Sequence, residues 1–247
     1  MRQIIGAIID ANEQFNLIEE GDCIAVGVSG GKDSMTLLYG LHLYSQFTKG
    51  KFKVIGITLK LGFPNMDFTR IEEFCKDKNI EYHLVPTKVY DVLKEKVDNQ
   101  GKIQCSLCSK FKKALLINEA KKLGCNKVAM AHHFDDGIET LFMNAIYNGY
   151  LATFKPKMYL DRTDVTFIRP LVLCKEDVIK KAVLKNNIPV VPSKCPNDKH
   201  TSREVIKQWL KEVYQKFPTA ELNFQNMLLN PERVTLWESD EKEGCLD

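Results

Sequence analysis

A glycine-rich loop after an apolar run constrains the fold of this chain more than any other feature. The run covers residues 23–28, the loop Ser-Gly-Gly-Lys-Asp-Ser covers residues 29–34, and an apolar helical pattern resumes over residues 35–44. Glycines adopt backbone angles closed to other residues, so successive N–H groups can converge on an anion at the start of the following helix. The lysine adds a positive charge and the serines add two hydroxyl groups. The stretch predicts a strand, a phosphate-binding turn and a helix.

The loop differs from the common nucleotide-binding signature. The pattern GxxxxGK[ST] is absent, and Lys32 is followed by Asp33 rather than by a hydroxyl residue. An ordinary turn between a strand and a helix remains the alternative interpretation.

Strands and helices alternate along most of the chain, which predicts a doubly wound, mostly parallel α/β sheet with its ligand at the carboxyl ends of the strands. Residues 149–163 read as a loop or hairpin. A last strand over 188–191 is confined to an edge or a strand start, because Pro189 has no N–H to donate. The other strands are expected over 23–28, 53–59, 82–86, 127–131 and 165–168, and the helices over 2–17, 35–44, 69–78, 109–123, 135–147 and 175–186.

The chain divides into a central domain with helical additions at both ends. Residues 1–19 form an N-terminal helix, residues 20–200 the nucleotide domain, and residues 201–247 two further helices with an acidic tail. No apolar run approaches the ~20 residues that span a bilayer, and the N-terminus lacks a signal-peptide layout, so we expect a cytoplasmic protein without a membrane partner. The net charge of +3 neither demands nor excludes nucleic acid.

Cysteine spacing points to a second kind of chemistry. Cys105 and Cys108 form a CxxC motif before a helix expected to begin at Ser109, and Cys195 lies in a polar, turn-like stretch. A cytosolic CxxC is a redox pair, half of a zinc site or two ligands of an iron–sulfur cluster. Three thiolates would hold a four-iron cluster and leave one iron without a protein ligand, where sulfide can bind. A redox or zinc pair with Cys195 as a bystander remains open.

The segment His132-His133-Phe134-Asp135-Asp136 runs from a strand into a helix. Acids at a helix start are favoured by capping and by the helix dipole, which is the structural interpretation. The functional interpretation places them in the crevice beside the glycine loop, where an acid can hold Mg²⁺ or act as a base. His132 and Ile57, the latter in the second strand, are then expected to line the nucleotide pocket.

Taken together, the motifs resemble a known family. The loop resembles that of the PP-loop ATP pyrophosphatases, which implies the adenine nucleotide alpha hydrolase-like fold. The joint pattern over about residues 20–200 is similar to the tRNA 2-thiocytidine synthetases and, more distantly, to the iron–sulfur tRNA 2-thiouridine synthetases. The matching segments are residues 29–34, Gly-Phe-Pro at 62–64, Cys-Ser-Leu-Cys at 105–108, His-His-Phe-Asp-Asp-Gly-Ile-Glu-Thr-Leu-Phe at 132–142 and Ile-Arg-Pro-Leu-Val-Leu-Cys-Lys-Glu-Asp at 168–177.

The resemblance implies an RNA-binding transferase of tRNA processing. Such an enzyme adenylates the C2 oxygen of a tRNA base, releases pyrophosphate and inserts sulfur, with 2-thiocytidine as the expected product and ATP, Mg²⁺ and a [4Fe–4S] cluster as cofactors. It implies Lys112 and Asp136 as catalytic residues and Asp135 as a candidate for Mg²⁺. The remaining implied site residues are Ser29, Gly30, Gly31, Lys32, Asp33 and Ser34 for the ATP phosphates and Cys105, Cys108 and Cys195 for the cluster.

One departure from the family pattern and three rival interpretations accompany this resemblance. The 2-thiocytidine enzymes carry a second CxxC where this chain has a single Cys195 after Pro-Ser-Lys. The rivals are an iron–sulfur sulfurtransferase or desulfurase acting on a small molecule or free nucleotide, a non-catalytic ATP-binding or iron–sulfur carrier, and zinc in place of iron. The expected partners are tRNA and a sulfur donor, either a cysteine desulfurase or free sulfide, and a homodimer is left open.

Overall fold

A six-stranded sheet forms the centre of the computed structural model, which describes residues 1–63, 66–95, 105–192 and 202–237, with only the backbone of Cys105 and Ser106. The strand order is β3-β2-β1-β4-β6-β5, and every neighbouring pair is parallel except the β5–β6 hairpin. This confirms the doubly wound, mostly parallel sheet. The strands are β1 (Cys23–Gly27), β2 (Lys53–Lys60), β3 (Glu81–Pro86), β4 (Lys127–Ala129), β5 (Lys157–Leu160) and β6 (Val165–Ile168).

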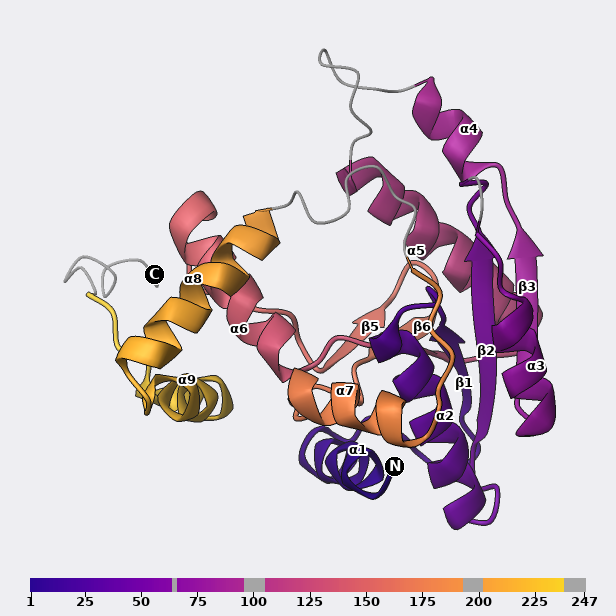
Figure 1. The fold of residues 1–247 in the computed structure, drawn as a ribbon, viewed down its shortest axis with the longest axis horizontal. Coiled ribbons are helices and arrows are strands. Elements are labelled where there is room, and N and C mark those ends of the chain that lie inside the picture. Colours follow the sequence, from indigo (N-terminus) through magenta and orange to yellow (C-terminus); the bar gives the residue numbers. More distant parts are fainter. Residues whose placement is uncertain (64–65, 96–104, 193–201, 238–247) are drawn as a thin grey trace, which may run out of the picture.

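Helices cover both faces of the sheet (Figure 1). Apolar residues of α1, α2, α3 and α7 form one core with alternate residues of β1, and α5 forms a second core on the opposite face. The helices are α1 (Arg2–Phe15), α2 (Lys32–Phe47), α3 (Thr69–Asp77), α4 (Val89–Lys94), α5 (Cys105–Lys122), α6 (Phe134–Met143), the π-helix η1 (Asn144–Asn148), α7 (Glu176–Lys185), α8 (Ser202–Lys216), α9 (Ala220–Leu229) and the 3₁₀ helix η2 (Pro231–Arg233).

Strand order places the glycine loop and the histidine–aspartate segment side by side. β1 lies between β2 and β4, so the chain leaves β1 toward one side of the sheet and reaches β4 on the other. The two loops that follow these strands flank the crevice where strand order reverses, which is where ligands bind in open α/β sheets. Both candidate nucleotide segments therefore reach the same crevice.

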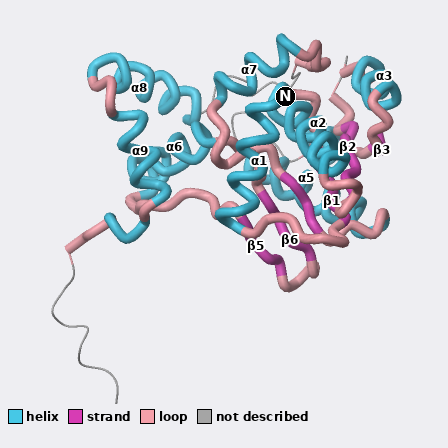
Figure 2. Tube along the Cα trace, turned by 90° about the horizontal axis from the view of Figure 1, so that it is seen from below, coloured by secondary structure: helices cyan, strands magenta, loops and turns pink. Residues whose placement is uncertain are grey.

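A third apolar core lies away from the sheet. Phe134 and Ile138 of α6 pack against Ile206 and Leu210 of α8, with side chains of α9 around them. Figure 2 shows α6, α8 and α9 together on one side of the molecule. The C-terminal helices therefore pack on a helix that carries two of the expected catalytic acids. The acidic tail expected over residues 238–243 lies outside the described residues.

Two local expectations are wrong. Helix α5 begins at Cys105 rather than at Ser109, so Cys108 lies inside the helix. Residues 188–191 form no strand, because the N–H of Val191 donates to the carbonyl oxygen of Gly30 at 2.9 Å instead of to a strand. The stretch over 149–163 supplies β5, the first strand of the hairpin, and α4 has no counterpart among the expected helices.

In the described part of the chain, no helix has both the length and the apolar character needed to cross a membrane.

Candidate functional site

The glycine loop is held in shape by its own serines. Gly30 has a φ of +89°, a conformation that favours glycine. The Ser34 hydroxyl lies 3.2 Å from the Ser29 hydroxyl, accepts a hydrogen bond from the Ser29 N–H at 3.2 Å and donates to the Gly31 carbonyl at 3.0 Å. Helix α2 begins immediately afterwards, at Lys32. The loop thus presents a helix N-terminus, which binds anions through its N–H groups and dipole.

Lys32 is fixed by two acids. Its Nζ atom lies 2.9 Å from Oδ2 of Asp33 and 3.0 Å from Oε1 of Glu176. Burial lowers the pKa of Lys32, but these carboxylates more than offset it, so the pKa is raised above the usual value. Lys32 is therefore a fully charged ammonium at neutral pH, as a phosphate-binding lysine must be.

Asp33 carries an oxygen that is available to a metal ion. Its Oδ1 atom is buried and has no hydrogen-bond partner among the residues that the structure describes. Because a buried carboxylate oxygen is normally bonded, this atom fits a Mg²⁺ ion brought in with ATP. Asp33 is thus a candidate metal ligand in addition to the phosphate-binding role that the resemblance implies.

His132 is kept neutral by its surroundings. Burial, followed by the positive charge of Arg169, lowers the pKa of His132 to about 4. The Nε atom of Arg169 donates to Nδ1 of His132 at 3.1 Å, and the ring of His132 stacks near Phe154 with centroids 4.9 Å apart. His132 therefore presents a fixed, uncharged ring.

His133, by contrast, lies among carboxylates. It is 3% exposed, and its ring nitrogens lie 3.4 Å from Oδ2 of Asp135, 3.5 Å from Oδ2 of Asp136 and 3.8 Å from Oδ1 of Asp33. Burial lowers the pKa of His133, but these acids raise it above the usual value. His133 is the residue that connects the loop to the acids of α6.

Both aspartates at the start of α6 have structural roles. Asp136 and His133 form a reciprocal capping box at the start of the helix, in which Oδ2 of Asp136 accepts from the His133 N–H at 3.0 Å. Oδ2 of Asp135 accepts from the Glu176 N–H at 2.7 Å, the first amide of α7. Asp136 therefore caps α6 as the structural interpretation expects, whereas Asp135 bonds the start of a different helix, α7. These contacts use Oδ2, whereas Oδ1 of Asp136 lies 3.4 Å from Arg203 of α8.

A cavity of about 630 Å³ brings many of the expected residues together. Among the expected site residues, those lining it are Ser29, Gly31, Ile57, Cys108, Lys112 and His132. Residues from the loop, from β2, from α5 and from the end of β4 thus share one space. Asp135 and Asp136 are not among the residues that line it.

The thiols fit an iron–sulfur site in part. Cys108 is buried, lines the cavity, and lies in the same helix that Cys105 begins. Val191 also lines the cavity, four residues before Cys195 in sequence. The side chain of Cys105 and the whole of Cys195 lie outside the described residues, so the three-thiolate site stays a prediction.

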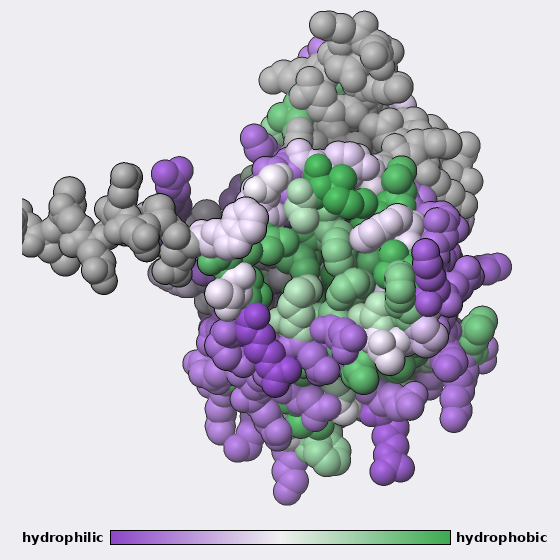
Figure 3. Space-filling model, turned by 90° about the vertical axis from the view of Figure 1, so that its left-hand side faces the viewer, coloured by the Kyte–Doolittle hydropathy of each residue, from purple (hydrophilic) through white to green (hydrophobic). Residues whose placement is uncertain are grey.

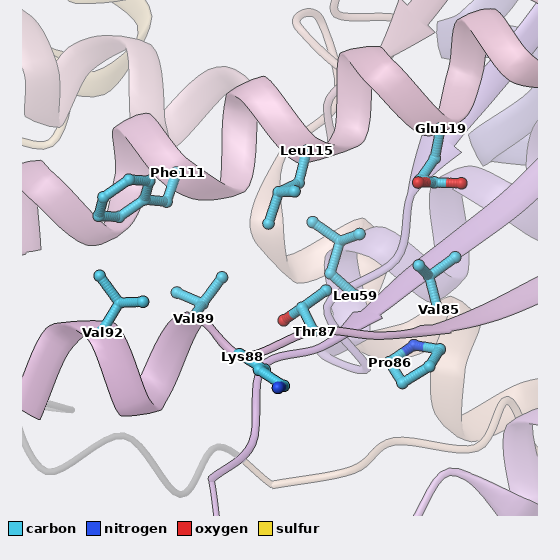
Figure 4. Close-up of a pocket in the computed structure, with 10 residues that line it drawn as sticks. All are labelled: Leu59, Val85, Pro86, Thr87, Lys88, Val89, Val92, Phe111, Leu115 and Glu119. Atoms are coloured by element: carbon cyan, nitrogen blue, oxygen red, sulfur yellow. The ribbon is translucent and has the colours of Figure 1, made fainter.

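A smaller cavity of about 300 Å³ lies between α5 and the edge of the sheet (Figure 4). Figure 4 shows apolar side chains, among them Val89, Phe111 and Leu115, pointing into it from both sides. Its charged lining residues are Lys88 and Glu119. It has neither a phosphate-binding loop nor a thiol among its lining residues, so we assign the chemistry to the larger cavity.

Sequence reasoning missed several residues of the site. Arg169 and Glu176 lie in the segment 168–177 that carries the resemblance, but the resemblance assigns no role to them. Arg203 and Lys207 contact the acids of α6 and α7 from a helix about 60 to 70 residues away in sequence from α6. Such contacts have no local signal in a single sequence.

Comparison with known proteins shows the family of this chain. The model of the PP-loop domain family matches residues 7–214, and the chain therefore belongs to that class of proteins. Within it, the chain belongs to the enzyme family that includes the tRNA-cytidine(32) 2-sulfurtransferases of Geobacter metallireducens, 35% identical over 99% of this chain and 95% of the relative, and of Geobacter sulfurreducens, 36% identical over 93% and 90%. The family resemblance read from the motifs is confirmed.

A solved structure supports the fold. The U34-tRNA thiolase NcsA from Methanococcus maripaludis, determined with its [4Fe-4S] cluster, superimposes with a TM-score of 0.71 over 94% of this chain and 80% of that chain. The two sequences are 20% identical, so this similarity concerns the fold alone.

Proposed function

We propose that this protein is an ATP-dependent tRNA sulfurtransferase that replaces the C2 oxygen of a cytidine by sulfur. The observation that carries the proposal is the cavity in which the phosphate-binding loop, Lys112 and Cys108 meet. Such an enzyme activates an oxygen with ATP and then replaces it by sulfur. Both the phosphate-binding loop and the thiol must therefore lie within reach of the same base. The named relatives in Geobacter give the proposal its substrate.

The proposed reaction has an activating step. The C2 oxygen of the base attacks the α-phosphorus of ATP, pyrophosphate leaves, and the oxygen becomes part of a good leaving group. Charge develops on the pyrophosphate, and in this proposal the loop amides, the N-terminus of α2 and the Lys32 ammonium stabilise it. Mg²⁺ on Asp33 or on Asp135 would add to that stabilisation.

Sulfur enters in the second step, in which a sulfur nucleophile attacks C2 and AMP leaves. Cys105, Cys108 and Cys195 would hold the [4Fe–4S] cluster, which supplies a site for sulfur at the level of sulfide. Lys112 lines the same cavity as Cys108 and provides a positive charge to the C2 oxygen and the α-phosphate. Asp136, through its Oδ1 atom, is the proposed acid or base beside Arg203.

The proposed partners follow from this reaction. They are tRNA, a sulfur donor that is either a cysteine desulfurase or free sulfide, and a second copy of the chain. The proposed location is the cytoplasm. A homodimer is supported by apolar side chains that are more than half exposed in, or just after, η1 and the C-terminal helices. Figure 3 views the molecule from the side of these helices, with apolar residues gathered at the centre of the face. The exposed side chains include Ile146, Tyr147, Leu151, Phe217 and Leu222. Light scattering on the purified protein measures the mass directly.

Nucleoside analysis of tRNA tests the activity. Cells that lack this protein should lose 2-thiocytidine, and the wild-type chain should restore it, whereas Lys112→Ala should restore less than a tenth. Unchanged thionucleosides in the deficient cells would contradict tRNA thiolation. If ATP-dependent sulfur transfer then occurs on a free nucleotide, the small-molecule interpretation is correct.

Anaerobic purification tests the cluster. The wild-type protein should contain iron and sulfide and show the visible charge-transfer absorption of a cluster, while Cys195→Ala should lose most of both elements. Cys174→Ala is the control, because Cys174 is 2% exposed and lies in the core between α7 and the sheet rather than in the cavity. A full cluster in Cys195→Ala, or zinc in place of iron, would contradict the assignment.

A further inference from the structure

Three lysines converge on one buried carboxylate next to the phosphate loop. Oε1 of Glu176 lies 3.0 Å from Nζ of Lys32, and Oε2 lies 2.9 Å from Nζ of Lys180. Lys207 of α8 reaches both oxygens, at 3.1 Å from Oε1 and 3.0 Å from Oε2. Burial raises the pKa of Glu176, but hydrogen bonds from these lysines lower it far below its usual value, so the carboxylate is charged.

Lys207 therefore shares a single carboxylate oxygen with the lysine of the loop. The two ammonium groups come from α8 and from the start of α2, which are about 170 residues apart in sequence. Their side chains are 27% and 30% exposed, whereas that of Glu176 is 10% exposed. The carboxylate is thus the most buried part of the arrangement, and both lysine side chains keep more than a quarter of their surface exposed.

The charges of this group are unevenly balanced. Lys32 has a second acid, Asp33, at 2.9 Å, and Lys180 has Asp177 at 3.5 Å. In the parts of the chain that the structure describes, Glu176 is the only acid within ion-pair distance of Lys207. One carboxylate shared among three ammonium groups leaves Lys207 only partly neutralised, and a partly neutralised lysine beside the N-terminus of α2 attracts phosphate.

Helix α8 holds Lys207 firmly in this place. One turn earlier, Arg203 contacts Oε2 of Glu139 at 3.1 Å and the Thr140 hydroxyl at 3.0 Å, both in α6. Ile206 is buried in the apolar core shared with α6. The lysine is therefore presented by a packed helix rather than by a free surface segment, which reduces the entropy lost when it binds a ligand.

We propose that Lys207 is a phosphate-binding residue of the ATP site, held beside Lys32 by Glu176 as a positioning residue. The inference rests on the proposed function and extends the nucleotide site from the central domain to α8. When the phosphate chain of ATP reaches the loop, Lys207 binds the phosphate oxygens together with Lys32, while Glu176 keeps the two lysines in register.

The test compares binding of α,β-methylene-ATP, which is not cleaved between the α and β phosphates, with binding of adenosine, which has no phosphate. By calorimetry on the full-length chain, Lys207→Met should weaken α,β-methylene-ATP about tenfold or more, the range expected for one charge-assisted contact, and leave adenosine within twofold. Lys207→Arg, which keeps the charge, should retain most of the affinity. Lys211→Met, an exposed lysine one turn further along α8, is the matched control and should not change either affinity.

Each other outcome has a distinct meaning. If Lys207→Met binds α,β-methylene-ATP within twofold of the wild type while Lys32→Met loses binding, this role of Lys207 is wrong and the proposed ATP site stands. If Lys207→Met weakens adenosine as much as the nucleotide and also lowers the melting temperature, Lys207 is only structural. If the wild-type protein binds no α,β-methylene-ATP, the proposed nucleotide site fails, and this role fails with it.

Discussion

Gly30 is the loop residue whose backbone and surroundings both require glycine. Its φ is +89°, and a Cβ atom there would lie 3.1 Å from Cβ of Val191 and 3.3 Å from a ring carbon of Phe68. We expect Gly30→Ala to lower the free energy of unfolding by about 1 to 3 kcal/mol through backbone strain and crowding. It should also weaken ATP binding at least tenfold, because the loop amides would move.

The matched control is Gly21→Ala. Gly21 has the same φ of +89°, but nothing lies within 4 Å of the position that a Cβ atom would occupy. It should therefore show only the conformational cost, about 1 kcal/mol, with unchanged ATP affinity. Urea denaturation and calorimetric ATP titration measure both effects. Equal ATP affinities of Gly30→Ala and wild type would contradict the role of this turn in binding phosphate.

The titration of His132 makes the free energy of unfolding fall as the pH falls. Its pKa is about 4 in the folded protein, against an ordinary value of 6.5, because of burial and then Arg169. Between these two values the unfolded chain binds the proton and the folded chain does not, so this stabilising contribution is present above pH 6.5 and is lost as the pH falls toward 4. Over that range this contribution of His132 to the free energy of unfolding falls by roughly 2 to 3 kcal/mol.

Urea denaturation at pH 7.5 and pH 5 measures this effect. The wild type should lose more stability than His132→Gln, whose side-chain oxygen can still accept from Arg169 but does not titrate. Equal losses in the two proteins would show that other groups control the pH dependence.

At the scale of elements, the sequence predicts what local patterns specify. The central strands β1 and β2 are predictable because they are buried on both faces and read as apolar runs, at residues 23–28 and 53–59. Helix α5 begins four residues earlier than expected, because the CxxC motif reads as a loop before the helical pattern becomes clear. The capping of α7 by Asp135 and the contacts of Arg203 are not predictable, because both join segments that are distant in sequence.

The start of helix α5 lines the cavity that the proposed function assigns to the tRNA base, so we expect exposed lysines there to contact tRNA, and the helix offers a matched test. Lys110 is exposed near the start of the helix, two residues before Lys112, which lines the cavity. Lys122, at the other end, is 68% exposed and forms an ion pair with Glu119 at 2.7 Å. We expect Lys110→Ala to weaken tRNA binding a few-fold and to reduce the salt slope of the binding constant by about one.

Filter binding at several salt concentrations measures that slope, with Lys122→Ala as the control that should change neither quantity. ATP affinity should be the same in both variants. An equal loss in the two variants would point to a diffuse charge effect, and no loss in either would remove this face of α5 from the tRNA contact.

At the scale of the whole molecule, the C-terminal helix α8 contacts residues of the candidate site. The boundary expected at residue 201 separates the central domain from an addition, and nothing in the local sequence indicates how the two meet. The structure joins them through the apolar core of α6 and α8 and through Arg203 and Lys207, which contact Glu139 and Glu176. The physical reason is that Phe134 and Ile138 of α6 are apolar and need α8 to bury them.

Because α8 packs on the central domain, removing the C-terminal helices should change both stability and ATP binding. A chain that ends at residue 200 would expose Phe134 and Ile138, which are 3% and 1% exposed in the full chain. Exposing two such side chains costs roughly 3 to 6 kcal/mol, which for a protein of this size corresponds to a fall in melting temperature of about 10 °C or more. The shortened chain should also lose ATP affinity, because Lys207 is removed and Glu176 loses one of its three lysines.

Scanning calorimetry and ATP titration measure both effects of the truncation. The control is a chain that ends at residue 237, since this deletion removes none of the described contacts and should leave the melting temperature and the ATP affinity unchanged. A chain of residues 1–200 that melts at the wild-type temperature and binds ATP normally would show that the central domain is complete without α8. A loss of ATP affinity without a fall in melting temperature would instead assign α8 to the nucleotide site alone, because the apolar core of α6 would then tolerate exposure.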